Sequence, residues 1–209
     1  MNQEHRILIV PTGRMDGRSY LIVCPHTGQA AIVDPDVNDE ALLDAVARQG
    51  LTVPYILLTH CHFDHMSSAD RVRAATGAQT LIHRLDAPGL ADPRLNMSVM
   101  DAERIHGRQV DRTLEDGDRL LIGEVPVDVL LTPGHSPGSV CYRVGDDLLT
   151  GDTLFRGSYG NPGFPGGHLP TLRQSCLTLF ALPDEVRVYP GHGEPTTIGQ
   201  EKRSNPILL

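Results

Sequence analysis

The chain has 209 residues, of which 40% are hydrophobic, and carries a net charge of −8. This length and composition fit one globular domain over residues 1–209, and the acidic balance argues against a general affinity for nucleic acid or an anionic membrane. No apolar run is long enough for a signal sequence or a membrane span, and the four cysteines are scattered without a C-x-x-C pair, so we expect a cytoplasmic protein.

The first half of the chain alternates predicted strands and helices. Runs rich in β-branched and apolar residues predict strands at 6–12, 19–24, 29–33, 54–58 and 79–83. A helix is predicted over 39–49, capped by Asn38 and closed by Gly50. A second helix is expected to begin near Ser68 and to end at Gly77. The resulting order, βββαβαβ, is typical of an α/β protein.

The second half begins with a long irregular segment. Proline and glycine interrupt residues 84–108, and we interpret this segment as a lid or a pocket wall. Residues 111–122 predict a hairpin around the turn Glu115–Asp118. Further strands are expected at 125–131, 139–144, 148–150 and 185–189. Helices are expected at 170–182, with Leu172, Cys176, Leu177 and Phe180 on one face, and at 198–203.

The run Thr59-His60-Cys61-His62-Phe63-Asp64-His65 follows directly after the predicted strand at 54–58. It places three imidazoles and one carboxylate within six residues. Imidazole nitrogens and carboxylate oxygens are ligands that suit zinc, iron or manganese. We therefore predict a metal site at this turn. Cys61 is interpreted as a buried structural thiol, because the middle side chain of an extended H-x-H points away from the two histidines.

Three later strands also end in a residue that can bind a metal. These residues are His135, Asp152 and His192, and each has a glycine beside it. Strand ends at one edge of a sheet converge in space, and glycine permits close approach of the backbone. Asp34, at the end of an earlier strand, is expected to orient a ligand rather than to bind metal itself. His83 and His106 are interpreted as surface or hydrogen-bonded histidines outside the site.

Seven side chains thus form the predicted ligand set. They are His60, His62, Asp64, His65, His135, Asp152 and His192. Seven ligands exceed the needs of one metal ion and fit two ions that share one carboxylate and one bridging water. We therefore expect two divalent cations, with zinc favoured and iron or manganese as alternatives.

From Asp34 to His192 the chain resembles the metallo-β-lactamase fold superfamily, whose motifs are H-x-H-x-D-H, a later His, a bridging Asp and a final His. The resemblance implies an α/β fold, an αββα sandwich with the metals at one edge. It also implies that His60, His62 and His135 hold one metal, that Asp64, His65 and His192 hold the other, and that Asp152 bridges them.

Within that superfamily the chain is most similar to short glyoxalase II-like (hydroxyacylglutathione hydrolase-like) enzymes. The phrases that carry this similarity are Thr132–Ser139, Gly151–Phe155 and Pro190–Gly193. The resemblance implies a metallo-hydrolase that acts on a small-molecule thioester. A metal-bridging hydroxide would attack the thioester carbonyl, and a thiolate, with an ordinary pKa of about 8–9, would leave without a general acid. Asp64 is the candidate catalytic residue, because it could orient the hydroxide or accept its proton.

Two departures leave the thiol carrier open. Glyoxalase II proteins that use glutathione have a basic residue in the loop after the bridging aspartate, where this chain has Asn161, and a C-terminal helical extension that is not found before Leu209. Arg156, Arg173 and Arg203 are candidate substitutes. The alternative function is that of a mononuclear iron persulfide dioxygenase, with iron on His60, His135 and Asp152, and a further alternative is hydrolysis of a lactone or another ester.

Overall fold

The computed structural model describes residues 4–12, 15–101, 104–106 and 109–209. Part of the predicted 84–108 segment lies outside the described residues. In the described part of the chain, none of the helices combines the length and the apolar character needed to cross a membrane.

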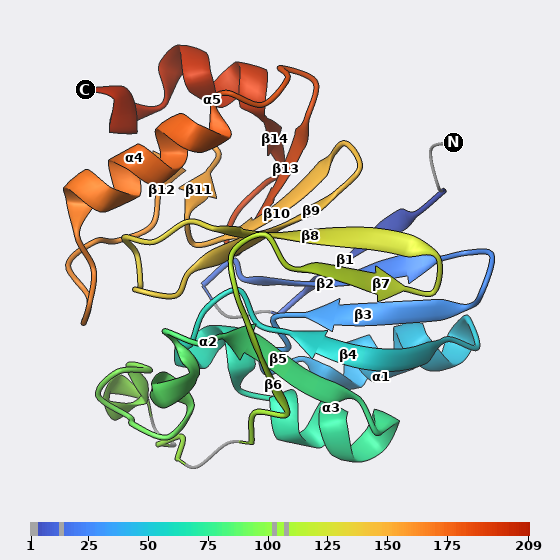
Figure 1. Ribbon diagram of the computed structural model, residues 1–209. Helices are drawn as coiled ribbons and strands as arrows, with labels where there is room; N and C mark the ends of the chain where they lie inside the picture. Colours follow the sequence, from blue (N-terminus) through green and yellow to red (C-terminus); the bar gives the residue numbers. More distant parts are fainter. Residues whose placement is uncertain (1–3, 13–14, 102–103, 107–108) are drawn as a thin grey trace.

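Two six-stranded sheets form the centre of the molecule (Figure 1). The first sheet has the order β1-β2-β3-β4-β5-β6, in which β1 to β3 are antiparallel and β3 to β6 are parallel. Its strands are β1 Arg6–Pro11, β2 Arg18–Cys24, β3 Gln29–Val33, β4 Thr52–Leu57, β5 Gln79–His83 and β6 Arg112–Leu114.

The second sheet has the order β14-β13-β10-β9-β8-β7. Its strands are β7 Arg119–Ile122, β8 Val125–Leu131, β9 Val140–Val144, β10 Asp147–Gly151, β13 Arg187–Pro190 and β14 Thr196–Thr197. Strands β10 and β13 are parallel and the other neighbours are antiparallel. A separate two-stranded ribbon pairs β11 Leu154–Phe155 with β12 Ser158–Tyr159.

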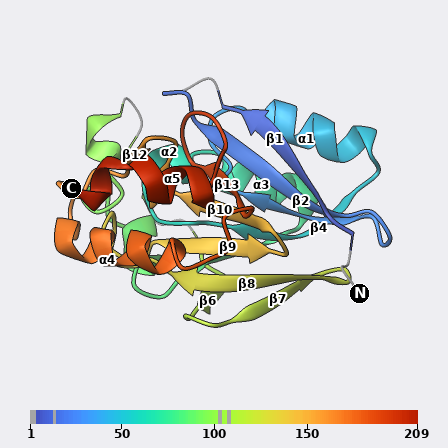
Figure 2. The ribbon, with the colours of Figure 1, turned by 90° about the horizontal axis from the view of Figure 1, so that it is seen from above.

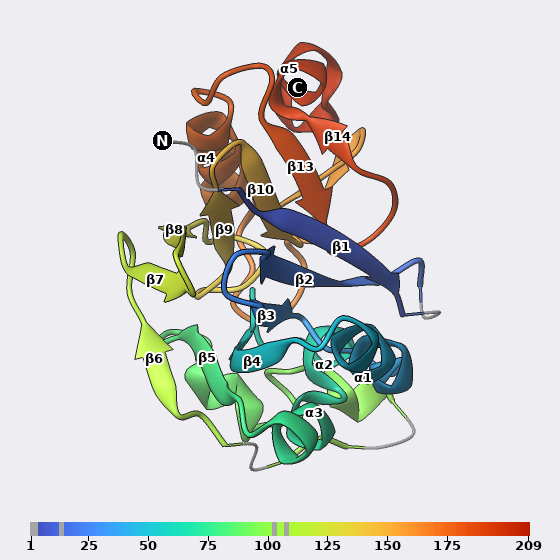
Figure 3. The same cartoon turned by 90° about the vertical axis from the view of Figure 1, so that its right-hand side faces the viewer.

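Helices cover the outer face of each sheet, which is clear when the molecule is seen along its layers (Figure 3). The first sheet carries α1 Asp39–Arg48, α2 Phe63–Met66 and α3 Ala69–Thr76, and the second carries α4 Leu169–Leu179 and α5 Ile198–Ser204. From above, α4 and α5 lie across the second sheet (Figure 2). Three short 3₁₀ helices complete the described elements: η1 Ala87–Leu90, η2 Ser98–Met100 and η3 Pro206–Leu208.

Three apolar clusters hold the four layers together. One lies between the first sheet and its helices and includes Leu42 and Val72, and one lies between the two sheets and includes Tyr20 and Tyr142. The third lies between the second sheet and α4, and includes Leu172. Successive side chains of a buried strand serve opposite faces, so one sheet contributes to two clusters. The predicted αββα sandwich is therefore confirmed.

Most predicted elements form close to their expected bounds, and three expectations are wrong. Residues 111–122 are not a hairpin: β6 pairs with β5 in the first sheet, β7 pairs with β8 in the second, and the turn crosses between the sheets. Asn38 precedes α1 but makes no capping bond, because its amide donates to the carbonyl of Pro11. Leu177 lies on the exposed face of α4, at 41% exposure.

Candidate metal centre

All seven predicted ligands meet at one edge of the sandwich, where strands of both sheets end. The turn after β4 supplies His60 and His62, and the short helix α2 supplies Asp64 and His65. The turns after β8, β10 and β13 supply the other three, His135, Asp152 and His192. Residues as far apart in the chain as Asp64 and His192, 128 positions, thus become neighbours because the second sheet lies face to face with the first.

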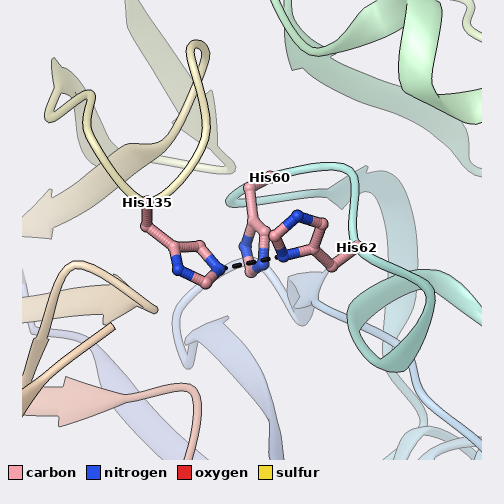
Figure 4. A group of neighbouring side chains, drawn as sticks. All are labelled: His60, His62 and His135. Atoms are coloured by element: carbon pink, nitrogen blue, oxygen red, sulfur yellow. Dashed lines mark hydrogen bonds between the residues drawn. The ribbon is translucent and has the colours of Figure 1, made fainter. Parts of the chain in front are cut away.

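The side chains form two groups. In the first, ring nitrogens of His60, His62 and His135 lie within 4.8 Å of one another, and His62 Nδ1 is 2.9 Å from His135 Nε2 (Figure 4). In the second group, the ligand atoms of Asp64, His65 and His192 also lie within 4.8 Å of one another. There His65 Nε2 is 3.3 Å from His192 Nε2, which is 3.3 Å from Asp64 Oδ2.

Asp152 lies between the two groups and turns one oxygen toward each. Its Oδ1 is 3.2 Å from His65 Nε2 and 3.6 Å from His192 Nε2, whereas its Oδ2 is 3.5 Å from His135 Nε2. Gly191 makes this approach feasible, since a Cβ there would lie 2.4 Å from Asp152 Oδ1. A carboxylate placed in this way can be shared between two cations.

Most of the histidines are oriented by a hydrogen bond on the ring nitrogen that faces away from the group. His65 Nδ1 contacts Asp34 Oδ2 at 2.9 Å, and His60 Nδ1 contacts Thr59 Oγ1 at 3.0 Å. The carbonyl of Asn161 accepts from His135 Nδ1 at 3.0 Å, and that of Met15 accepts from His192 Nδ1 at 2.9 Å. Such outer partners fix the tautomer, so the Nε2 lone pair of each of these four rings is free for a cation.

Buried ring nitrogens without a hydrogen-bond partner indicate that this set of donors fits metal ions. His60 Nε2 and His62 Nε2 are buried without a hydrogen-bond partner. Leaving a buried polar atom unsatisfied costs roughly 1–3 kcal/mol, and a bound cation removes that cost at His60. Pairs of imidazole nitrogens about 3 Å apart, surrounded by carboxylates, are typical of a cation site. The cluster is therefore a His/Asp metal-binding site of the binuclear type.

The two groups differ in their affinity for protons. Burial holds the pKa values of His60 and His135 below their usual range and lowers the pKa of His62 to about 3. Burial also acts to lower the pKa of His65, but the carboxylates of Asp152, Asp34 and Asp64 outweigh it and raise that pKa well above 6.5. Without metal, protons therefore bind more readily to His65 in the second group than to the histidines of the first group.

Asp34 orients candidate ligands, as the sequence predicted, and the structure shows that it does so for two of them at once. This buried residue adopts a left-handed conformation with φ 50°. Besides contacting His65, its carboxylate accepts from the amide of Thr59 at 2.7 Å and from the Thr59 hydroxyl at 2.6 Å. Thr59 in turn contacts His60. One carboxylate therefore orients a ligand in each group.

We expect Asp34→Asn to lower metal affinity by about 10- to 100-fold, because an amide cannot accept all three of these bonds. Competition titration with a coloured chelator measures the affinity, and circular dichroism confirms the fold. Asp44→Asn, which changes an exposed carboxylate on α1, is the matched control. Unchanged affinity in the Asp34 variant would remove it from the site.

Asp86 is a functional residue that sequence reasoning did not single out. It is buried, and its carboxylate joins the two loops that carry the first group. It accepts from the amide of Cys61 at 3.0 Å, from the Ser136 hydroxyl at 2.6 Å and from the amide of Gly138 at 2.5 Å. No motif marks this position, because its partners lie 25 to 52 residues away. Only the folded chain brings them together.

For Asp86→Asn we expect metal affinity at the first group to fall about tenfold. This is the lower end of the loss that follows substitution of residues that support metal ligands. The second group should lose less affinity, because the bonds of Asp86 reach Cys61, Ser136 and Gly138, which flank ligands of the first group. Metal titration followed by mass spectrometry of the intact protein distinguishes binding of the first metal ion from binding of the second. Asp92→Asn, in the same segment but paired with Arg94 at the surface, is the control. Equal losses at both groups would contradict this role.

The remaining residues considered in the sequence lie away from the cluster. His83 lies outside the ligand groups, as expected, and it is buried. Its Nδ1 accepts from the amide of Leu85 at 3.3 Å, whereas its Nε2 has no hydrogen-bond partner. His106 is exposed. Cys61 is buried, and burial raises the pKa of its thiol well above 9, as expected for a structural cysteine. Arg173 and Arg203 lie on the surface, where Arg173 donates to the carbonyl of Leu208.

Comparisons with known proteins agree with this site. The family model of the metallo-beta-lactamase superfamily matches residues 12–192. A probable metallo-hydrolase of Bacillus subtilis, YqgX, is 36% identical over 203 residues, which cover 95% of each chain. The crystal structure of BLEG-1 B3 metallo-beta-lactamase has a TM-score of 0.92 at 36% identity, with 98% of this chain and 100% of that chain covered.

The structure of TTHA1623 in a di-iron-bound form has a TM-score of 0.82 at 35% identity, and the match covers 97% of this chain and 100% of that one. The family model, the identity to YqgX and the agreement of both structures over nearly the whole chain point to the same group of proteins. Together with the seven residues gathered at the sheet edge, they show that the chain belongs to the metallo-beta-lactamase superfamily and is a probable metal-dependent hydrolase.

Proposed function

We propose that this protein is a binuclear metal-dependent thioester hydrolase. The observation that carries the proposal is Asp152, whose two oxygens face the two ligand groups. We assign His60, His62 and His135 to one metal, Asp64, His65 and His192 to the other, and Asp152 to both. Zinc is favoured, and iron and manganese suit the same donors. Two such ions supply hydroxide at neutral pH and polarise a carbonyl group.

The chain's own residues account for the remaining steps. Asp64 lines the pocket beside the centre. Burial acts to raise its pKa, but His65 and His192 outweigh this and hold the pKa below its usual value. Asp64 is thus ionised at neutral pH and can accept a proton from the attacking water. His62 and Asp152 also line the pocket, so a substrate bound there lies beside the cluster.

The pocket favours a leaving group that needs no proton. Among the described residues that line it, every side chain able to donate or accept a proton belongs to the ligand set. An alkoxide or an amide anion would require a general acid, whereas a thiolate with an ordinary pKa of about 8–9 leaves as the anion. This supports a thioester over an ester or a lactone.

The first experiment pairs metal analysis with hydrolysis assays. Protein purified without added metal should contain about two equivalents of zinc, iron or manganese and should hydrolyse thioesters. S-lactoylglutathione and an acyl thioester of N-acetylcysteamine are the substrates. About one equivalent of iron, with oxygen uptake on a persulfide and no hydrolysis, would establish the dioxygenase function instead.

Hydrolysis of β-lactams is the second candidate, because the structure of BLEG-1 is that of a B3 metallo-beta-lactamase and superposes with a TM-score of 0.92. A coloured cephalosporin tests this activity with the same preparation. Turnover of the cephalosporin that exceeds turnover of every thioester would replace our first proposal.

A further inference from the structure

A pocket of about 460 Å³ opens directly onto the candidate metal centre. Four of the residues that line it belong to the ligand set, namely His62, Asp64, Asp152 and His192. A substrate whose reacting carbonyl lies at the metals must therefore place one of its substituents in this pocket. The chemistry of the other walls decides which substituent fits.

Those other walls are apolar. They are formed by Met15, Phe63, Met97, Met100 and Phe164. Phe164 packs edge-on against His62, with ring centroids 5.4 Å apart, so the apolar surface begins at the ligands themselves. Met100 is 73% exposed and Met15 is 59% exposed. Large apolar side chains gathered at the mouth of a pocket mark a place where a ligand buries them.

Hydrogen bonds attach the segment that carries Met97 and Met100 to the turn that carries the candidate ligands. Asn96 is fully buried and donates to the carbonyls of Gly89 and Ile105, at 2.8 and 3.1 Å. Its own carbonyl accepts from the amide of Phe63 at 2.8 Å. Met97, the next residue, adopts a left-handed backbone conformation with φ 65°. The segment thus presents its methionines from a defined backbone, while their thioether side chains adapt to the shape of the ligand.

The charges near the pocket disfavour a substituent with carboxylates. A second cavity of about 270 Å³ shares Met15 and His192 with the first, and Asp16, Arg156 and Glu194 also line it. Because Glu194 is paired with another arginine, Asp16 is the lining carboxylate that balances the charge of Arg156. Arg18, which is close by, is already paired with Glu194 at 2.5 Å. Among the described residues lining the first pocket there is neither lysine nor arginine.

We infer that the pocket binds the aliphatic acyl chain of a thioester, so that the preferred substrates are thioesters of apolar carboxylic acids rather than of short hydroxy acids. This inference rests on the proposed thioesterase function and names its substrate class. The acyl group reaches the apolar pocket from the carbonyl that lies at the metals. Met15, Met97, Met100 and Phe164 determine specificity by covering its methylene groups.

The test is a series of N-acetylcysteamine thioesters from acetyl to octanoyl, assayed with the metal-loaded protein. Each added methylene should raise kcat/KM by about three- to fourfold until the pocket is filled. The kcat/KM for S-lactoylglutathione should be lower than that for the butanoyl thioester. A flat series, or a dependence on the length of the thiol at constant acyl group, would overturn the inference.

Substitutions of the pocket methionines test whether these side chains, and not other exposed apolar residues, set the preference for long acyl chains. In Met15→Ser combined with Met100→Ser, the ratio of octanoyl to acetyl kcat/KM should fall by about tenfold, because two large apolar side chains are lost from the binding surface. Both side chains are largely exposed, so the fold should tolerate the change. Leu121→Ser, at an equally exposed leucine on β7, is the control and should leave the ratio unchanged. An unchanged ratio in the double variant would contradict the assignment.

A binding measurement distinguishes failure of this inference from failure of the proposed function. Isothermal titration of the metal-loaded protein with butanoic, hexanoic and octanoic acid needs no turnover. Affinity that rises about three- to fourfold per methylene would support the pocket even without thioester hydrolysis. Thioester hydrolysis without any dependence of rate or affinity on chain length would leave the function standing and overturn the inference.

Discussion

Replacing Asp152 by alanine is expected to abolish most of the activity and to cost the protein at least one metal ion. Loss of an outer partner of a ligand costs about 10- to 100-fold in affinity or activity, and Asp152 contacts the ligand nitrogens of both groups directly. We therefore expect kcat/KM to fall by more than ~100-fold. Without this carboxylate, His65 and His135 also lose the negative charge between them.

The measurements are kcat/KM with a thioester and metal content by inductively coupled plasma mass spectrometry. Asp146→Ala is the matched control, because Asp146 is an exposed aspartate beside the beginning of the same strand, β10. It should keep full metal content and full activity. If Asp152→Ala also kept both, Asp152 would not bridge the two groups, and the binuclear proposal would be wrong.

Removing the metals is expected to lower the melting temperature by at least about 5 °C. A ligand at about 100 times its dissociation constant stabilises the folded state by ~2.7 kcal/mol, and 1 kcal/mol corresponds to ~2–4 °C for a chain of this size. The physical reason is local: without cations, five imidazoles and two carboxylates remain packed together, and His60 Nε2 has no partner. Thermal unfolding before and after dialysis against a chelator measures the change.

Adding zinc back should restore the melting temperature, which distinguishes metal removal from irreversible damage to the protein.

The two metals are also expected to leave in a fixed order as the pH falls. In the second group, burial opposes protonation of His65 but the neighbouring carboxylates outweigh it and raise its pKa, so protons displace metal there in mild acid. In the first group, burial lowers the histidine pKa values, so those rings stay neutral and keep their metal at lower pH. Simultaneous loss would contradict this order.

The sequence by itself determined the seven candidate ligands and the elements that carry them. A donor that directly follows a run of apolar, β-branched residues can be read from local pattern, because strands have a period of two and end at turn residues. The H-x-H-x-D-H turn and the residues His135, Asp152 and His192 were all identified in this way, and so was the role of Asp34. The αββα architecture followed from the resemblance that these motifs carry.

Tertiary structure decided the features that depend on long-range neighbours. The pairing of residues 112–114 and 119–122 with different sheets depends on which edge strands are available, and the turn composition between them was equally consistent with a hairpin. Asp86 acquires its role from partners far along the chain.

The pocket wall likewise brings together Met15, Met97 and Phe164, which no local pattern relates to one another. Local chemistry specifies which atoms can bind a metal, whereas packing across the two sheets decides which atoms surround the substrate. The physical reason is that a local pattern records the preferences of a single element, while a pocket is formed by surfaces that meet only after folding.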